Sequence, residues 1–292
     1  MFNNYSIMIK TFLKSPAKIN LSLKIGKKIN YKYHNIQSVI FLINLHDKIT
    51  IKKITKKKDI LKFTGKFKKN IKLKNNSVLK SMYVLRKKNI ISNSSNYEIK
   101  VKKNIPVFSG LGGGSSNAAT IIKYFYKRRK IIDNDIDYFA KYLGSDFKLF
   151  FKNNKIIQEN FFNIRNFKFK HNFYLLIVYP FKKSSTKDVY SKIKKFEKIK
   201  KLNIFNKVSK SKMLDKLKSE TNSLENIVIS RFPLIKKVLK ELSLLKKCEF
   251  SRITGSGSAC FGLFLNKKDA LLGLKLIKRR FPKFWCVLSR TI

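Results

Sequence analysis

The sequence predicts an α+β protein of two domains, and three patterns carry that prediction. Residues 17–25 alternate apolar and polar side chains without a fault, as a half-buried strand does. A glycine-rich loop at 108–116 leads directly into an apolar-faced helix. Near the C-terminus, a strand, a glycine turn and a second strand (251–265) stand between two helices, which is typical of a small ferredoxin-like antiparallel sandwich. We therefore expect one domain over residues 1–165 and a second over 166–292.

The remaining elements are predicted from the periodicity of apolar residues. In the first half we expect strands at 38–44, 48–55 and 97–103, and helices at 75–88, 117–129 and 134–144. Gly144 is placed to end the last of these helices, with Asp146 on the loop beyond it. In the second half we expect a strand at 173–180, a lysine-rich stretch at 192–220 that is helical or loosely ordered, helices at 222–233 and 267–281, and a final strand at 285–289.

The charge of the chain is extreme but poorly informative. Its 292 residues include 67 lysines and arginines against 16 acidic residues, which gives a net charge of +51. Only nine of the basic residues are arginine, the side chain preferred for bidentate phosphate and base contacts, and the lysines are spread along nearly the whole chain. Lys, Asn, Ile and Phe are over-used together, which indicates an AT-rich coding sequence. We therefore expect the charge to lie mainly on solvated surfaces, with no specific nucleic acid partner.

Cysteine usage and hydropathy indicate the compartment. Cys248, Cys260 and Cys286 form no CxxC pair, which favours free thiols in a reducing environment. The three histidines show no zinc-ligand spacing. The longest apolar stretch, at 173–181, is far shorter than the roughly 20 residues of a membrane span. We expect a cytoplasmic protein with no membrane partner, present as a monomer or a weak homodimer.

The glycine-rich loop is the strongest local signal of function. Residues 108–120, FSGLGGGSSNAAT, hold four of the eleven glycines within five positions. The loop lacks the lysine of a Walker loop and the spacing of a dinucleotide fingerprint. Because a helix follows, with Ser115 and Ser116 as N-cap candidates, the loop predicts an anion site whose commonest ligand is phosphate. A flexible linker is the alternative interpretation.

The loop also resembles a known motif. The pattern P-x-x-S-G-L-G-G-G-S-S-N-A-A, which begins at Pro106, resembles the phosphate-binding loop of the GHMP kinases, named for galactokinase, homoserine kinase, mevalonate kinase and phosphomevalonate kinase. Four more segments resemble motifs of this family and of its branch of 4-diphosphocytidyl-2-C-methyl-D-erythritol kinases. They are, in the expected order, SPAKINLSL (15–23), YHNIQSV (33–39), LGSDFKLFF (143–151) and RITGSGSACFG (252–262). The ordered set covers most of the chain.

The resemblance implies a two-domain GHMP kinase fold, with a ribosomal protein S5 domain 2-like N-terminal domain and a ferredoxin-like C-terminal domain. It also implies ATP-dependent phosphorylation of the 2-hydroxyl of 4-diphosphocytidyl-2-C-methyl-D-erythritol, in the non-mevalonate isoprenoid pathway. Two alternatives stay open: another GHMP kinase, of the homoserine or mevalonate type, and a basic nucleic-acid-binding protein on the same fold. The segment at 33–39 argues against the first, because its aromatic residue and histidine suit the nucleotide end of a substrate.

The resemblance assigns the reacting groups as well. Asp146 is the implied base that takes the proton of the acceptor hydroxyl, and Lys18 is expected to pair with it and to stabilise charge near the transferred phosphoryl group. Taken alone, Lys18 would be one more solvated lysine and Asp146 a turn residue. Phe147 and Lys148 depart from the branch, which has a smaller valine and a proline there.

ATP and Mg²⁺ are the implied cofactors. The triphosphate is expected on the backbone amides of the loop, and Asn76 corresponds to an asparagine that lies near the ATP in this branch. The predicted nucleotide-binding residues are Pro106, Val107, Phe108, Ser109, Gly110, Leu111, Gly112, Gly113, Gly114, Ser115, Ser116 and Asn76. Ser115 or Ser116 is the expected protein contact for Mg²⁺.

The predicted substrate-binding residues are Asn20, Tyr33, His34 and Tyr190. Asn20 shares a strand face with Lys18 and is expected to orient the acceptor. The resemblance puts Tyr33 and His34 at the cytidine end, where an aromatic face stacks on the base and an imidazole bonds its edge. Tyr190 is expected to supply a second stacking face. An exposed or capping role for His34 and core packing for Tyr190 are the alternatives.

Overall fold

The computed structural model describes residues 10–30, 33–71, 74, 76–127, 129–199 and 208–292, and the chain forms two compact units. The first holds Met1–Pro16, His46–Val107 and Gly113–Phe151, and the second holds Ala17–Leu45, Phe108–Gly112 and Lys152–Ile292. Strands β1 (Thr11–Asn20) and β3 (His34–Ile54) and the glycine-rich loop run from one unit into the other. The expected domain boundary between residues 165 and 166 stays a prediction.

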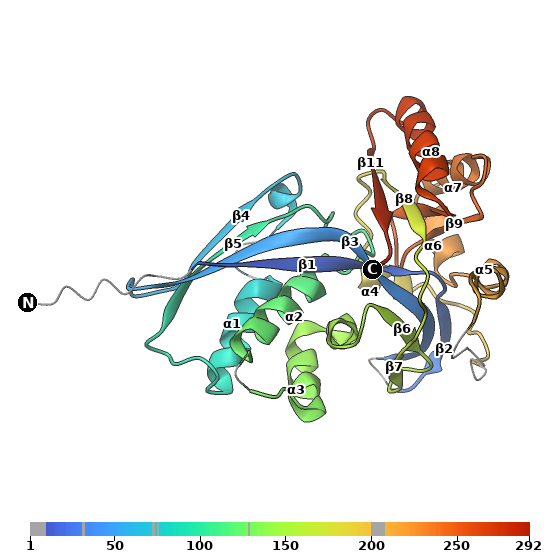
Figure 1. Ribbon diagram of the computed structural model, residues 1–292. Coiled ribbons are helices and arrows are strands. Elements are labelled where there is room, and N and C mark those ends of the chain that lie inside the picture. Colours follow the sequence, from blue (N-terminus) through green and yellow to red (C-terminus); the bar gives the residue numbers. More distant parts are fainter. Residues whose placement is uncertain (1–9, 31–32, 72–73, 75, 128, 200–207) are drawn as a thin grey trace, which may run out of the picture. The chain divides into compact units, whose positions relative to one another are not determined.

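A mixed sheet and three helices form the first unit (Figure 1). The second half of β3 pairs antiparallel with β5 (Asn96–Lys102), and β5 pairs parallel with β4 (Ile60–Thr64). Helices α1 (Ser77–Lys87), α2 (Gly113–Phe125) and α3 (Asp133–Leu143) pack together, with the 3₁₀ helices η1 (Lys68–Asn70) before α1 and η2 (Ser145–Phe151) after α3. Apolar side chains of β3, β5 and α2 are fully buried and form the core of this unit.

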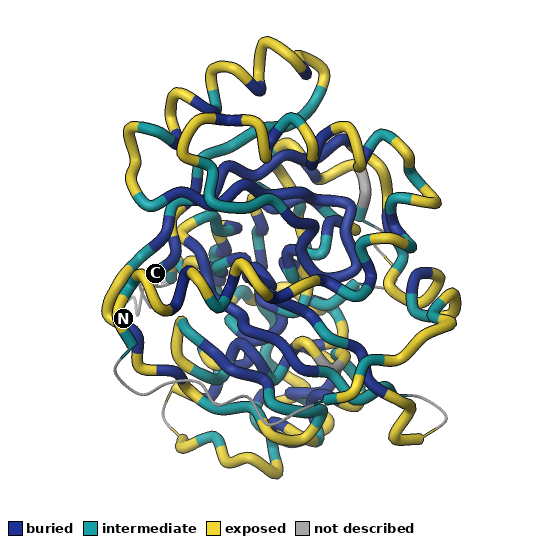
Figure 2. Tube along the Cα trace, turned by 90° about the vertical axis from the view of Figure 1, so that its right-hand side faces the viewer, coloured by how far each residue is buried: buried dark blue, intermediate teal, exposed yellow. Residues whose placement is uncertain are grey.

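The second unit contains two groups of strands. The first half of β3 pairs antiparallel with β2 (Lys24–Lys28) and with β6 (Lys155–Gln158), and β6 pairs with β7 (Ile164–Asn166). A separate antiparallel sheet has the order β11-β8-β10-β9. Its strands are β8 (Tyr174–Tyr179), β9 (Phe250–Ile253), β10 (Cys260–Phe264) and β11 (Trp285–Arg290). Strands β8 and β10 are buried along almost their whole length, and exposed residues lie mostly in loops and on helix surfaces (Figure 2).

Helices cover this four-stranded sheet. Helix α7 (Leu234–Ser243) packs on β9 and β10, and α8 (Lys267–Arg280) packs on β8 and β11. The shorter helices α4 (Thr186–Tyr190), α5 (Lys210–Ser219) and α6 (Glu225–Arg231) complete the unit. The order strand, helix, strand, strand, helix, strand is that of a ferredoxin-like sandwich, so the predicted fold of the C-terminal part is confirmed.

The single strand predicted at 17–25 is wrong, because β1 ends at Asn20 and β2 begins at Lys24. At the break, hydrogen bonds of side-chain hydroxyl groups take the place of the backbone hydrogen bonds between strands. Ser22 Oγ accepts a hydrogen bond from the Val39 N–H (3.1 Å), and Ser38 Oγ donates to the Ser22 carbonyl (2.5 Å). The strand therefore ends even though the alternation of apolar and polar residues continues through this part of the sequence.

Two further boundaries differ from prediction. The strands expected at 38–44 and 48–55 are one continuous strand, β3. The helix expected from Asn117 begins at Gly113, directly after Gly112, whose φ of +71° is the left-handed turn that starts it. Ser115 and Ser116 therefore lie inside the first turn of α2 and are not N-caps. Helix α7 was not predicted, whereas the helices expected at 75–88, 134–144, 222–233 and 267–281 are present as α1, α3, α6 and α8.

Candidate functional site

Lys18 and Asn20 form a buried polar cluster at the end of β1. Only 3% of Lys18 and 5% of Asn20 is exposed, so the polar side of this strand faces the interior and not solvent. Lys18 Nζ donates to Asn20 Oδ1, which confirms that the two side chains lie side by side. Asn20 Nδ2 donates in turn to Ser38 Oγ (2.9 Å), and the Asn20 N–H donates to Thr254 Oγ1 (3.0 Å). A buried ammonium held by an amide carbonyl is fixed in orientation, which suits a charge-stabilising role.

The glycine-rich loop and the third motif pack backbone against backbone in the second unit. A Cβ atom on Gly110 would lie 2.0 Å from the Thr254 carbonyl oxygen, and one on Gly255 would lie 3.0 Å from Lys18 Nζ. The Lys18 N–H donates to the Leu111 carbonyl (3.0 Å). The Ala259 N–H donates to the Ser109 carbonyl (3.1 Å). Three of the motifs seen in the sequence are thus brought together, and glycine is required where they touch.

In the first unit, the N-termini of α1 and α2 lie next to each other. A Cβ atom on exposed Gly114 would lie 3.6 Å from Ser77 Oγ. Asn76 is the N-cap of α1, and its Oδ1 accepts from the Val78 N–H (3.0 Å) and the Leu79 N–H (3.1 Å). Neither helix has an acidic residue in its first turn. Two positive helix ends with no acidic residue in their first turns favour an anion at this point.

A buried ion pair that the sequence analysis missed holds the chain ahead of the loop. Lys103 Nζ binds Asp47, and Asp47 Oδ1 also accepts from the Asn104 N–H (2.7 Å) and the Ile105 N–H (2.9 Å). A Cβ atom on Gly113 would lie 3.4 Å from Lys103 Nζ, so this ammonium lies beside the start of α2. Burial lowers the pKa of Lys103, and the charge of Asp47 opposes that shift. Nothing distinguishes Lys103 from the other lysines in the sequence.

Asp146 lies in η2, not on a loop, and its side chain is exposed. It belongs to the first unit, whereas Lys18 and Asn20 belong to the second. The two neighbouring residues that depart from the family branch, Phe147 and Lys148, both have partners in the structure. Phe147 is fully buried, with its ring 4.8 Å from that of Phe151, and Lys148 forms a 2.6 Å ion pair with Asp137. The bulkier Phe147 therefore anchors η2 in the core.

The residues predicted for the cytidine end lie in the second unit and contact one another or neighbouring phenylalanines through their rings. The His34 imidazole centroid lies 5.7 Å from the ring of Tyr190 and 5.5 Å from the ring of Phe196. Tyr33 stacks on Phe161, with centroids 4.6 Å apart and 29° between the planes. The structure thus brings His34 and Tyr190 together, and it adds two phenylalanines that no sequence pattern indicated.

His34 is expected to titrate below the usual range of an imidazole. Burial lowers its pKa from 6.5, a hydrogen bond with the Gly26 backbone opposes that shift, and the charge of Lys28 lowers the pKa further. The neutral ring therefore predominates at pH 7, and because the unfolded chain binds the proton first, acidification below about pH 6.5 destabilises the folded state. An NMR titration, with His34→Gln to identify the resonance, measures this midpoint. A midpoint at or above 6.5 would contradict the burial that the structure shows.

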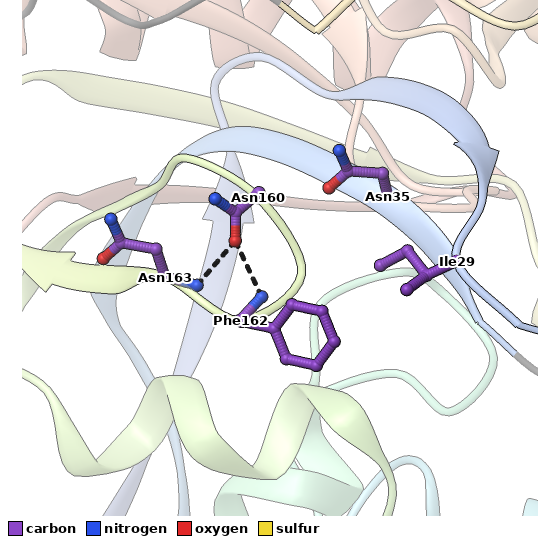
Figure 3. Close-up of a pocket in the computed structure, with 5 residues that line it drawn as sticks. All are labelled: Ile29, Asn35, Asn160, Phe162 and Asn163. Carbon is purple, nitrogen blue, oxygen red and sulfur yellow. Dashed lines mark hydrogen bonds between the residues drawn. The ribbon is translucent and has the colours of Figure 1, made fainter.

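One pocket lies beside the turn that carries Phe161. Its volume is about 640 Å³, and it is lined by Ile29, Asn35, Asn160, Phe162 and Asn163 (Figure 3). None of these residues is a predicted site residue. The pocket therefore lies at the turn between β6 and β7, next to the segment that carries Tyr33 and His34, and not at the glycine-rich loop.

Comparison with known proteins gives consistent results. The GHMP kinases N terminal domain family matches residues 76–144, and the GHMP kinases C terminal family matches 207–281. A 4-diphosphocytidyl-2-C-methyl-D-erythritol kinase of Pelagibacter ubique is 38% identical over 285 residues, which cover 96% of this chain and 98% of that protein. The kinase of the same name from Anaplasma marginale is 31% identical over 290 residues, 96% of each chain. The chain belongs to the GHMP kinase family.

Solved structures show the same fold. A crystal structure of 4-(cytidine 5'-diphospho)-2C-methyl-D-erythritol kinase is 21% identical with a TM-score of 0.72, covering 97% of this GHMP kinase and 100% of that chain. Homoserine kinase from Cytophaga hutchinsonii is 14% identical with a TM-score of 0.67, covering 100% and 97%. The two-domain GHMP kinase fold predicted from the motifs is therefore confirmed. Among the residues that the structure describes, no helix has both the length and the apolar composition to cross a membrane.

The metal prediction can be tested against the donors of this GHMP kinase. Within the described ranges, no group of three His, Cys, Asp or Glu side chains could hold an ion. Mg²⁺ commonly takes most of its ligands from phosphates and water, so a single hydroxyl at the phosphate site fits it. Ser116 is buried and its Oγ accepts a 2.7 Å hydrogen bond from Ser15 Oγ, whereas Ser115 is partly exposed. Ser115 is thus the better candidate.

Proposed function

We propose that this GHMP kinase transfers the γ-phosphoryl group of ATP to the 2-hydroxyl of 4-diphosphocytidyl-2-C-methyl-D-erythritol. The observation that carries the proposal is the pair of helix N-termini at Ser77 and Gly114, free of acidic residues in their first turns. The relatives named for this reaction, matched over almost the whole chain, support the choice of acceptor. Phosphoryl transfer depends chiefly on positioning and on charge neutralisation, and both are what such a site supplies.

The nucleotide is assigned to the glycine-rich loop and the two helix ends. Backbone N–H groups at the start of α2 are oriented to bind phosphate oxygens, and exposed Gly114 allows close approach because it has no side chain. Ser115 would be the protein contact for Mg²⁺, which would supply further positive charge at this site. Asn76 then has two roles. Its side chain caps α1, and the residue lies at the helix end that is assigned to the nucleotide.

The chemistry is assigned to one carboxylate and one ammonium. Asp146 accepts the proton of the acceptor hydroxyl as the phosphoryl group is transferred. Lys18, held by Asn20, stabilises the negative charge on the transferring group, and Asn20 orients the acceptor. At the other end of the acceptor, Tyr33 and Tyr190 offer aromatic faces to the cytosine, and neutral His34 bonds its edge. The Nδ1 atom of His34 is buried and has no hydrogen-bond partner in the structure, so a polar group of a bound base would satisfy it.

An acceptor panel tests the proposal. The purified chain with ATP and Mg²⁺ is given the cytidyl acceptor, homoserine or mevalonate, and phosphorylated product is measured by ³¹P NMR alongside coupled ADP release. We expect turnover with the cytidyl acceptor alone. Turnover with homoserine or mevalonate instead would assign another GHMP activity. Steeply salt-dependent binding of nucleic acid without ATP turnover would favour the nucleic-acid alternative.

A further inference from the structure

We infer that Phe161 and Phe196 are positioning residues for the nucleobase end of the acceptor, each holding one of the two side chains, Tyr33 and His34, that are proposed to meet the base. This inference rests on the proposed function, because it concerns the same acceptor. It adds two residues that neither the motifs nor the family resemblance indicated. Both act through a neighbour and not by contact with the reacting atoms.

Phe161 covers one face of the Tyr33 ring and is itself held firmly. The two ring centroids lie 4.6 Å apart with 29° between the planes, so the Phe161 ring packs on one face of Tyr33. The Phe161 N–H donates to Asn35 Oδ1 (3.0 Å), which ties the turn to β3. Asn160 Oδ1 accepts from the N–H groups of Phe162 (2.9 Å) and Asn163 (2.8 Å), as Figure 3 shows. The turn that presents Phe161 is therefore closed by its own side chains.

Phe196 holds His34 from a segment without helix or strand. Phe196 is 42% exposed, yet its ring centroid lies 5.5 Å from that of the imidazole with 31° between the planes. The next residue fixes it in place, because the Glu197 N–H donates to the Ile25 carbonyl (2.8 Å) and the Glu197 carboxylate accepts from Ser223 Oγ. A Cβ atom on Gly26 would lie 2.8 Å from Ile199 Cγ1, so the segment also packs closely against β2.

Both phenylalanines act by pre-organisation. Stacking on an aromatic side chain favours binding of a base, whereas ordering a mobile side chain on binding opposes it. A ring already packed against a fixed neighbour avoids most of that ordering cost. The same packing keeps His34 on the side of Tyr190, where one base could meet both. Removal of either phenylalanine should therefore weaken acceptor binding without affecting the phosphoryl-transfer step.

Steady-state kinetics of the full chain test this. In Phe161→Ala and Phe196→Ala we expect the KM for the cytidyl acceptor to rise about tenfold, with kcat and the KM for ATP within twofold of wild type. Phe161→Tyr and Phe196→Tyr keep a flat ring and should restore the wild-type KM. Phe162→Ala is the matched control, because Phe162 lies in the same turn, is 73% exposed and meets Phe161 edge-on. In Phe196→Ala, the pKa of His34 should also rise towards 6.5 because burial is lost.

Different outcomes test the proposed function and the positioning roles of Phe161 and Phe196 separately. No turnover of the cytidyl acceptor by the wild-type chain would overturn the proposed function. Turnover by wild type with both alanine variants within twofold of its KM, or with a loss confined to kcat, would overturn the positioning roles alone. If an alanine variant does not fold, Phe161→Leu and Phe196→Leu take its place, since leucine keeps apolar volume without the flat ring. An unchanged KM in those variants counts equally against the inference.

Discussion

Asp146→Asn is expected to lower kcat for phosphorylation of the cytidyl acceptor by about 10²–10⁴-fold, the usual contribution of a general base. Asparagine has the same shape as aspartate but cannot take up the hydroxyl proton. The side chain of Asp146 is exposed in η2, so the substitution should change the free energy of unfolding by only about 0.5 kcal/mol or less. The KM for ATP should stay within a few-fold of wild type, because the nucleotide is assigned to the helix ends. Steady-state kinetics with a thermal melt measure both effects.

Asp137→Asn is the control for this prediction. Asp137 is an exposed carboxylate of α3 in the same unit and pairs with Lys148 at 2.6 Å, so its loss removes equal charge and a surface ion pair. Surface pairs of this kind contribute about 0–1 kcal/mol to stability and should not affect kcat. If Asp146→Asn retained turnover within tenfold of wild type, or if Asp137→Asn lost as much, Asp146 would not be the base.

Local patterns in the sequence predicted most of the regular elements. Helix α3 ends at Gly144 as predicted because a glycine there can adopt the positive φ that stops a helix. The glycines of the loop predicted an anion site, and the structure adds that Gly110 lies against the carbonyl of Thr254. Lys18 and Asn20 were placed on one strand face by alternation alone, and that neighbourhood is confirmed by their hydrogen bond.

Features that depend on contacts between distant segments could not be predicted. The break between β1 and β2 follows from two hydroxyl bonds, from Ser38 Oγ to the Ser22 carbonyl and from the Val39 N–H to Ser22 Oγ, whereas the apolar alternation runs through it unchanged. The ion pair of Lys103 with Asp47 joins two residues that are ordinary in their own segments. Phe161 and Phe196 likewise gain significance only from rings far along the chain. The supporting residues of the site can therefore be recognised only from tertiary contacts, whereas the residues in its motifs can be recognised from the sequence.

Gly110→Ala is expected to destabilise the second unit by at least about 3 kcal/mol and to raise the KM for ATP in any protein that folds. Gly110 has a φ of +80°, which is unfavourable for a residue with a Cβ atom. The new methyl group would also lie 2.0 Å from the Thr254 carbonyl oxygen and 3.1 Å from the Gly257 backbone nitrogen. Both contacts are to backbone, so no side-chain rotation relieves them. The loop must move away from the third motif, and the phosphate-binding segment that it leads into must move with it.

Gly144→Ala separates the steric contact from the backbone conformation. Gly144 also has a positive φ, +94°, but a Cβ atom there would have nothing within 4 Å. Gly144→Ala should therefore be destabilised only by the unfavourable positive φ, by about 1–3 kcal/mol in the free energy of unfolding. Urea unfolding of both variants and of wild type measures the difference, with soluble yield as a second readout should Gly110→Ala be too unstable to purify. If Gly110→Ala proved no more destabilising than Gly144→Ala, the loop would not be packed against Thr254, and the convergence of the glycine motifs on Lys18 would lose its support.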